Sequence, residues 1–275
     1  MTKKDSGTAI SQAGPPDVWS RPIRVLGVKD GKLIRDRLKV VSEMPLTIVL
    51  NSEEVVTLLC VPDEPKFLAV GFLFSEGIIN SVENIFSIEE DPENSRVLVT
   101  AKTVERPDQT LRKRIVTTGC GKGTTFSYGI DEHSIAPFSG GIKVDLSTIF
   151  SLMKELSSRS LLYEETRGTH NSALASVDGI EVFHADVGRH NAVDKIYGQC
   201  MLEGISTENK LMVTTGRLTS EIIIKCARMG IAHLVSRHAA TSLAVDLANQ
   251  LNMTLVGYVR GPRLTVYSGF DRIRD

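Results

Sequence analysis

The chain of 275 residues is 41% hydrophobic and 24% charged, and its 32 basic side chains are balanced by 33 acidic ones. This length allows one large domain or two modest ones, and the near-neutral balance argues against nucleic acid as a main partner. No apolar run approaches the roughly 18 residues of a membrane span, and the N-terminus lacks the apolar h-region of a secretory signal. The four cysteines are too sparse for a disulfide scaffold. We therefore expect a soluble cytoplasmic protein with no membrane partner.

The first half of the chain has a predominantly strand-like texture. Residues 1–20 are small and polar, with Pro15 beside Pro16, and are expected to form a disordered tail. A hairpin turn is predicted at Asp30-Gly31, and the β-branched runs LTIVLN and VVTLLCV are typical of strands. Pro65 suits the first turn of a helix, and the apolar residues on most faces of KFLAVGFLFSEGII predict that this helix is largely buried. Strand texture returns in FSIEED and RVLVTAKTVE, and the aperiodic TTGCGKGTTFSYG predicts a loop.

In the second half, helices and strands alternate. Helical spacing predicts a helix in DLSTIFSLMKELSSRSLLY, and HNSALASVDGIEVFHADV predicts two strands with a hairpin turn at Asp178-Gly179. The following segments alternate between helix and strand: GRHNAVDKIYGQCMLEG, KLMVTTG, LTSEIIIKCARMG, IAHLVS, ATSLAVDLANQLN and MTLVGYVR. This alternation predicts an at least partly parallel sheet covered by helices. We therefore predict an α/β fold (α+β overall), with a tail to residue 20, a smaller β-rich N-terminal domain over 21–140 that includes the Cys120 loop, and an α/β domain over 141–275.

One of the four cysteines differs from the others in its surroundings. Cys60, Cys200 and Cys226 lie in apolar strand or helix patterns, which predicts core packing. Cys120 instead lies between two glycines in the aperiodic loop. Nearby cations, Lys122 among them, would favour its thiolate if they fold close by, and a thiolate is what nucleophilic or sulfur-carrying chemistry requires. An incidental exposed cysteine in a flexible loop fits this pattern equally well.

Zinc is not expected. No C-x-x-C motif is present, because Gly123 stands three residues after Cys120. A structural zinc site needs four well-spaced ligands. The segment His184-Ala185-Asp186 has a faint likeness to the H-x-E motif of zinc deaminases, but the P-C-x-x-C partner of that motif is absent.

Several arginine- and glycine-containing clusters fall at predicted strand ends or helix starts. Ligands of α/β sheets bind beyond the carboxyl ends of strands, where glycine turns and arginine forks suit phosphate oxygens. The clusters therefore predict a site for a large phosphorylated ligand, with ordinary turns and solvated arginines as the alternative. No Walker A or G-x-G-x-x-G motif is present, and His170 and His190 are interpreted as contacts rather than catalysts. The clusters are residues 167–170, 186–191, 214–217, 237–238 and 260–263.

Four segments of the chain resemble, in order and spacing, the formate dehydrogenase accessory sulfurtransferases (the FdhD/NarQ family). They are HADVGRHNAVDK, TTGRLTSEIIIKCARMGI, RGTHNSAL and SLAVDLANQLNMTLVGYVRGPRLTVY, and TTGCGKGT falls where the family carries its sulfur-relay loop. The resemblance, which extends from about Ile23 to Tyr267, implies a carrier that takes sulfane sulfur from a cysteine desulfurase as a persulfide. It also implies delivery of that sulfur to the molybdenum of the bis(molybdopterin guanine dinucleotide) cofactor before insertion into apo formate dehydrogenase. A cytidine-deaminase-like C-terminal domain without zinc is implied as well, in a homodimer that binds the guanine nucleotide, for which GDP is a partial mimic.

The resemblance carries over to particular residues. Cys120 would hold the persulfide, and the family's cofactor-binding segment would correspond to Tyr258, Val259, Arg260, Gly261, Pro262 and Arg263. The residues that would flank the pocket are Gly188, Arg189, His190, Asn191, Thr215, Gly216 and Arg217.

The sequence departs from the family at the relay loop. The family loop usually reads C-G-x-C-G, whereas this chain reads C-G-K-G-T, with Gly123 in place of the second cysteine. A two-cysteine relay is therefore impossible within this loop. A single persulfide is chemically sufficient, because the acceptor metal or an external reductant can take the outer sulfur. The alternatives are a non-catalytic cofactor-binding chaperone for formate dehydrogenase maturation and, more distantly, a zinc hydrolase of the deaminase type.

Overall fold

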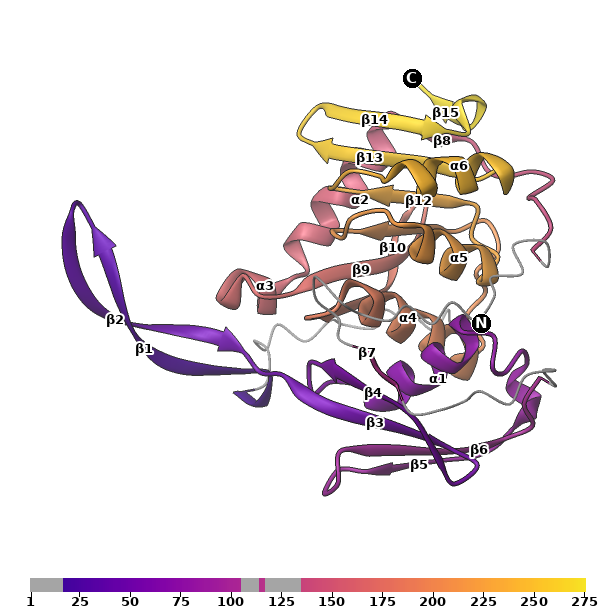
Figure 1. Cartoon of the computed structure of the whole chain (residues 1–275). Coiled ribbons are helices and arrows are strands. Elements are labelled where there is room, and N and C mark those ends of the chain that lie inside the picture. The colour runs from indigo at the N-terminus through magenta and orange to yellow at the C-terminus, as the bar shows by residue number, and fades with distance from the viewer. Residues whose placement is uncertain (1–16, 105–113, 117–134) are drawn as a thin grey trace, which may run out of the picture.

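The structure is a computed structural model, and it describes residues 17–104, 114–116 and 135–275. Figure 1 shows the C-terminal half around one sheet, the N-terminal half around a second sheet, and a long hairpin that projects from the body. Asp17–Trp19 form a short 3-10 turn, η1, so the described chain is already ordered where the predicted tail ends. None of the helices in the described ranges is long and apolar enough to cross a membrane.

The second half of the chain forms a six-stranded sheet. Its central strands β11, β12 and β13 are parallel, whereas β9, β10 and β14 join through antiparallel pairs. Helical crossovers join the parallel strands, as parallel pairing requires. The mixed α/β fold predicted from the sequence is thereby confirmed, and the more specific likeness to cytidine deaminases stays a prediction. In spatial order the strands are β10 (Gly179–Asp186), β9 (His170–Ser176), β11 (Leu211–Thr214), β12 (His233–Ser236), β13 (Thr254–Arg260) and β14 (Arg263–Ser268).

Helices cover both faces of this sheet (Figure 1). Successive residues of a strand point to opposite faces, so Met212 and Val213 of β11 enter separate hydrophobic clusters. Val213 packs in the cluster that contains Leu156 of α2, and Met212 packs in the cluster that contains residues of α4, α5 and α6, such as Ile196. The helices are α2 (Leu146–Ser158), α3 (Leu161–Thr166), α4 (Arg189–Glu203), α5 (Ser220–Arg228) and α6 (Ser242–Gln250).

The first half forms a five-stranded sheet with one helix packed on it. The helix α1 (Pro65–Ser75) lies between this sheet and α4, and its residues 68–75 are buried, which confirms the predicted buried helix. Ile48 of the sheet, Leu73 of α1 and Ile196 of α4 belong to a single core. The two halves therefore share one hydrophobic core, and the predicted domain boundary between residues 140 and 141 stays a prediction. The strands, in spatial order, are β5 (Ile85–Asp91), β6 (Arg96–Ala101), β3 (Met44–Leu50), β4 (Glu53–Cys60) and β7 (Arg114–Val116).

A two-stranded arm, formed by β1 (Ser20–Lys29) and β2 (Lys32–Val41), extends away from the body (Figure 1). Asp30 and Gly31 make its turn with positive φ angles of 51° and 75°, as the twist of a tight hairpin requires. The predicted hairpin is therefore confirmed. At the base of the arm, Lys39 forms a 3.0 Å ion pair with Glu165.

Three details differ from the elements expected from sequence. The segment predicted as one helix is two, because α2 ends at Ser158 and α3 begins at Leu161. The last long strand does not end the sheet: Gly261 turns the chain with a φ of 55° and β14 returns beside β13. The strands β8 (Val144–Asp145) and β15 (Ile273–Arg274) pair in parallel and are too short to leave a periodic pattern.

Candidate functional site

The clusters that were predicted to form a site meet at one edge of the six-stranded sheet. The parallel strands β11, β12 and β13 end at this edge, and β9 begins there because Ser172 pairs with Thr214. β10 also ends there, because Asp186 pairs with His170. The helices α4, α5 and α6 follow these strands and begin on the same side, so their first-turn N–H groups lie at this edge too.

A cavity of about 590 Å³ opens at this edge. Its walls come from segments that are far apart in the sequence, with α3 on one side and the ends of β11, β12 and β13 on the other. Guanidinium forks at such a place suit the oxygens of a phosphate. From the predicted clusters, the cavity is lined by Arg167, Gly168, Thr169, His170, Val187, Thr215, Arg237, His238 and Arg260.

Two buried polar atoms in the wall of this cavity have no hydrogen-bond partner among the described residues. They are Oγ1 of Thr169, a residue that is 6% exposed, and Oδ1 of Asn171, a residue that is 2% exposed. Buried polar atoms are normally hydrogen-bonded, and the exceptions point to a missing partner such as a ligand. The cavity thus offers unsatisfied hydrogen-bonding groups beside its arginines. Asn171 is not among the site residues predicted from the sequence.

The histidines of the cavity lie in cationic surroundings. Burial lowers the pKa of His170, and the charges of Arg189, His238 and Arg217 lower it further. The pKa of His238 is also lowered, by burial and then by Arg260, Arg237 and Arg217. Both imidazoles are therefore mostly neutral near pH 7, and the positive charge of the site comes from the arginines.

The predicted segment Thr215-Gly216-Arg217 forms the turn after β11. Thr215 lines the cavity, and its Oγ1 accepts a 3.0 Å hydrogen bond from the backbone N–H of Asn171. Gly216 is buried, and a Cβ atom there would lie 2.9 Å from Cβ of Arg189, so only glycine lets the start of α4 come this close. Arg217 is exposed and acts on both histidines through its charge rather than by lining the cavity.

The predicted segment from Tyr258 to Arg263 surrounds the turn between β13 and β14. Tyr258, Arg260, Pro262 and Arg263 line a second cavity of about 910 Å³, together with Leu146 and Phe150 of α2. Arg260 lines both cavities. Val259 points the other way and is buried in the core beneath α2, and Gly261 provides the turn.

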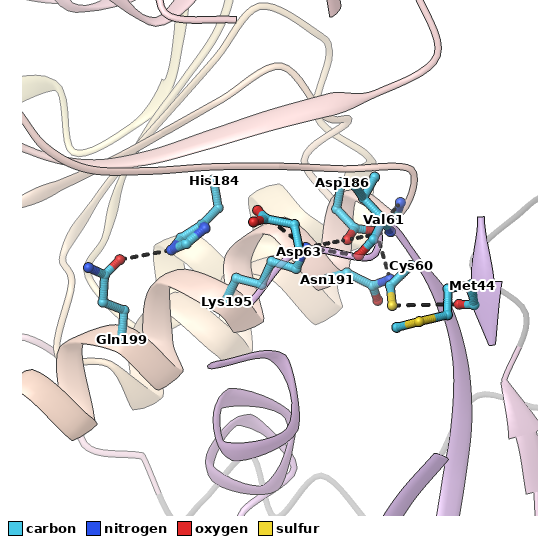
Figure 2. Close-up of polar contacts among 10 residues, drawn as sticks. Met44, Cys60, Val61, Asp63, His184, Asp186, Asn191, Lys195 and Gln199 are labelled. Carbon is cyan, nitrogen blue, oxygen red and sulfur yellow. Dashed lines mark hydrogen bonds and ion pairs between the residues drawn. The ribbon is translucent and has the colours of Figure 1, made fainter. Parts of the chain in front are cut away.

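The predicted block around α4 has a different role for part of its length (Figure 2). The carboxylate of Asp186 accepts hydrogen bonds from the backbone N–H of Gly188 (3.0 Å) and from Nδ2 of Asn191 (2.9 Å). It also forms a 2.9 Å ion pair with Lys195, and both of these side chains are 0% exposed. The structure therefore places Asn191 in a buried polar network and not in the wall of either cavity.

This network joins the two halves of the chain. Nδ2 of Asn191 donates to the carbonyl oxygen of Leu59 at 2.8 Å, and the backbone N–H of Val61 donates to Asp186 at 3.1 Å. Leu59 belongs to β4, whereas Asp186 and Asn191 belong to β10 and α4. The ion pair between Asp186 and Lys195 was not predicted, because the spacing of two charged residues in a sequence does not show that both are buried.

His190 lies beside the site at the start of α4. Its Nε2 is 3.2 Å from Oε2 of Glu221, which belongs to the first turn of α5. Burial, followed by the charges of Lys225 and Arg189, holds the pKa of His190 well below its ordinary value. The imidazole is therefore mostly neutral near pH 7, it lines neither cavity, and its interpretation as a ligand contact stays a prediction.

The described cysteines are core residues. Cys60, Cys200 and Cys226 are buried, and burial is the largest cause that raises the pKa of each to about 12. They are thiols, and the prediction of core packing is confirmed for all of them. Cys120 and its loop lie outside the described residues. Within the ranges that the structure does describe, no group of three or more His, Cys, Asp or Glu side chains is arranged to hold a metal ion.

Comparison with known proteins identifies relatives of this chain. A protein from Bacillus subtilis named sulfur carrier protein FdhD is 37% identical over 262 residues, which cover 94% of this chain and 97% of that protein. A protein of the same name from Listeria monocytogenes is 40% identical over 237 residues, or 85% of this chain and 91% of that one.

A solved structure agrees with these relatives. The crystal structure of a candidate formate dehydrogenase accessory protein from Desulfotalea psychrophila matches with a TM-score of 0.79 and 30% identity, covering 93% of this chain and 100% of that chain. Residues 41–274 match the FdhD/NarQ family as a whole. The resemblance found in the sequence is thereby confirmed, and the chain belongs to the FdhD/NarQ family.

Proposed function

We propose that this chain is a sulfur carrier for formate dehydrogenase, which holds sulfane sulfur on Cys120 and delivers it to the molybdenum of a bis(molybdopterin guanine dinucleotide) cofactor. The name of the curated relatives, sulfur carrier protein, supports the first part. The observation that carries the second part is the cavity at the sheet edge, where Arg237 and Arg260 lie with an unsatisfied Asn171.

The two cavities suit a long ligand with phosphates near its middle. Volumes of about 590 and 910 Å³ are those of ordinary ligand pockets. Arg260 lines both, so its guanidinium group can hold phosphate oxygens while the rest of the ligand extends to either side. Phe150 and Tyr258 provide ring faces in the second cavity, and Asn171 provides an acceptor for a base N–H in the first. The cofactor bound here is the client of the carrier, not its resident group.

The sulfur chemistry needs one thiolate. The Cys120 thiolate attacks the outer sulfur of a persulfide on a cysteine desulfurase, forms a new S–S bond and releases the thiolate of the donor, with no net oxidation. Delivery as sulfide then requires two electrons, which a reduced molybdenum centre or an external thiol supplies as the S–S bond breaks and Cys120 returns as a thiolate. A second cysteine at position 123 is not needed for either step.

Mass spectrometry tests the sulfur-carrying step. After incubation with a cysteine desulfurase and cysteine, we expect the intact chain to gain about 32 Da per sulfur atom, and we expect treatment with a thiol reductant to reverse the gain. The variant Cys120→Ala should show no gain although it keeps Cys60, Cys200 and Cys226. A gain that persists in this variant, or no gain in the wild type, would contradict the proposal.

Calorimetry with GDP tests the cofactor site independently of sulfur. We expect Arg237→Ala or Arg260→Ala to weaken GDP binding by about 1.5–3 kcal/mol, the scale of a hydrogen bond to a charged group. Arg96→Ala is the matched control, because Arg96 lies on β6 of the other sheet, where it forms a 3.3 Å ion pair with the half-exposed Glu54. Unchanged affinity in both cavity variants would place the nucleotide elsewhere.

One feature of the sequence favours a second candidate, a non-catalytic chaperone that shelters the cofactor. Gly123 stands where the family usually has its second loop cysteine. Under this alternative, Cys120→Ala would still bind GDP and would still support maturation of formate dehydrogenase. Loss of maturation with intact GDP binding would instead support the sulfur carrier.

A further inference from the structure

The cavity of about 590 Å³ at the sheet edge has a carboxylate in its otherwise cationic wall. Among the described residues that line this cavity, Glu164 is the only acidic one, whereas Arg167, Arg237 and Arg260 supply guanidinium groups. Glu164 is exposed, and it forms no ion pair with another described residue. Phosphate oxygens suit the arginines but are repelled by a carboxylate. Glu164 therefore suits a different part of the ligand, one that offers hydrogen-bond donors.

Helical spacing brings Glu164 to the cavity and directs its neighbour elsewhere. Tyr163 and Glu164 of α3 line the cavity together with Arg167, which directly follows the helix. Residues three and four apart lie on the same side of a helix, so Arg167 shares a side with both. Glu165 is not part of the cavity wall, and its carboxylate forms the 3.0 Å ion pair with Lys39 of the arm. Two consecutive glutamates thus have different surroundings.

A second acceptor in the same cavity also lacks a partner. Oδ1 of Asn171 has no hydrogen bond within the described part of the chain, although this residue is only 2% exposed. A buried oxygen of this kind indicates a donor that a ligand would bring. Asn171 and Glu164 belong to β9 and α3, whereas Arg237 and Arg260 come from the ends of β12 and β13. The cavity therefore offers acceptors for one end of a ligand and guanidinium groups for its phosphates.

We propose that Glu164 selects the base of the bound nucleotide, by accepting hydrogen bonds from N1–H and from the 2-amino group of guanine. A carboxylate has two acceptor oxygens and no donor, and guanine presents two adjacent donors on its Watson–Crick edge. Adenine and cytosine each place an acceptor nitrogen beside their amino group, and uracil flanks its N–H with two carbonyl oxygens, so each would bring an acceptor against Glu164. This inference rests on the proposed function, which places a guanine nucleotide in the cavity, and it adds the residue that distinguishes the base.

Calorimetry of the full chain with a set of nucleoside diphosphates tests this assignment. The wild type should bind GDP most tightly, and inosine diphosphate, which lacks the 2-amino group, about tenfold to a hundredfold more weakly. In Glu164→Gln, the amide offers one acceptor and one donor. That pair suits xanthine, which has a carbonyl group in place of the amino group of guanine. We therefore expect the variant to lose affinity for GDP and to prefer xanthosine diphosphate. A general disturbance of the fold would weaken both ligands and would not exchange their order.

Two further variants separate recognition of the base from binding of the phosphates. Glu165→Gln makes the same change one residue along the chain, outside the cavity wall, and should keep the wild-type order of ligands. Arg237→Ala should weaken all the diphosphates by a similar factor and leave their order unchanged. GDP binding with an unchanged order of ligands in Glu164→Gln would overturn the role of Glu164 alone. A wild type that binds no nucleotide would overturn the cofactor site of the proposed function as well, whereas sulfur loading of Cys120 is measured independently of both.

Discussion

Gly71 of α1 and Gly198 of α4 face each other where these two helices cross. A Cβ atom on Gly71 would lie 1.7 Å from the carbonyl oxygen of Asp194, and one on Gly198 would lie 1.9 Å from the carbonyl oxygen of Phe67. The helices therefore touch backbone to backbone, at the place where the core of the N-terminal sheet continues into the α/β half.

Substitution at this crossing should be costly. Gly71→Ala or Gly198→Ala would force the helices apart, because no flexible side chain is there to move away. We expect each to reduce the free energy of unfolding by about 3 kcal/mol, the upper part of the usual range for overpacking, as measured by urea denaturation. Gly140→Ala is the control, since a Cβ atom there meets nothing within 4 Å. Equal stability of all three variants would show that the crossing can relax.

The buried Asp186–Lys195 pair makes a second prediction. Lys195→Met leaves the carboxylate of Asp186 buried without its cation, and the loss of one partner of a buried pair typically costs about 3–5 kcal/mol. The double variant Asp186→Asn/Lys195→Met removes both charges and should recover part of this loss. A double-mutant cycle from denaturation curves measures the coupling, and purely additive effects would argue against a coupled pair.

The sequence could predict that the arginine- and glycine-containing clusters meet at one edge of the sheet, because a general rule places them there. Residues that follow parallel strands, such as Thr215 and Arg237, must share an edge of the sheet once the strands are recognised. Asn171 could not be placed by that rule. It lies near the start of a strand, and it reaches the same edge only because β9 runs antiparallel to β11, which depends on a strand order that periodicity does not encode.

The sequence also could not show which of the predicted residues line the site and which have a structural role. Asn191 lies in the same predicted cluster as His190, and the spacing of these residues does not show that the side-chain amide of Asn191 donates to Leu59 and Asp186. Gly71 and Gly198 each look like an unremarkable glycine within a helix pattern. Their role depends on the contact between α1 and α4, two helices that are far apart in the sequence.

The carboxyl group of Asp63 predicts a pH dependence of stability. Burial raises the pKa of Asp63 from 3.8 to about 6, with Glu64 and Asp186 adding to the rise and Lys195 opposing it. Between these two values the folded state holds a proton that the unfolded state releases, so this group lowers stability as the pH rises from about 4 to 6. The full difference corresponds to at most about 3 kcal/mol.

Removal of this carboxyl group should change the slope of stability against pH. We expect Asp63→Asn to gain stability relative to the wild type as the pH is raised from 4 to 7, as measured by urea denaturation at several pH values. Asp246→Asn, at an exposed position of α6, is the control and should run parallel to the wild type. A constant difference between wild type and Asp63→Asn across this range would contradict the raised pKa.

Under the proposed function, the binding of GDP should be coupled to the uptake of protons by His170. Its pKa is lowered by burial and by neighbouring cations, chiefly Arg189. A bound diphosphate would favour the charged imidazole, so the pKa of His170 should rise on binding and the site should take up protons. The affinity for GDP should then increase as the pH falls from 7.5 towards 6.

Calorimetry in two buffers with different enthalpies of ionisation measures the protons taken up. GDP titrates in this range itself, so the informative quantity is the difference between the wild type and His170→Gln. We expect the variant to take up fewer protons and to show a flatter dependence of affinity on pH. Guanosine without phosphates serves as the control ligand, because it brings no negative charge to His170 and should cause no uptake. Identical proton uptake by wild type and variant would place the phosphates of GDP away from His170.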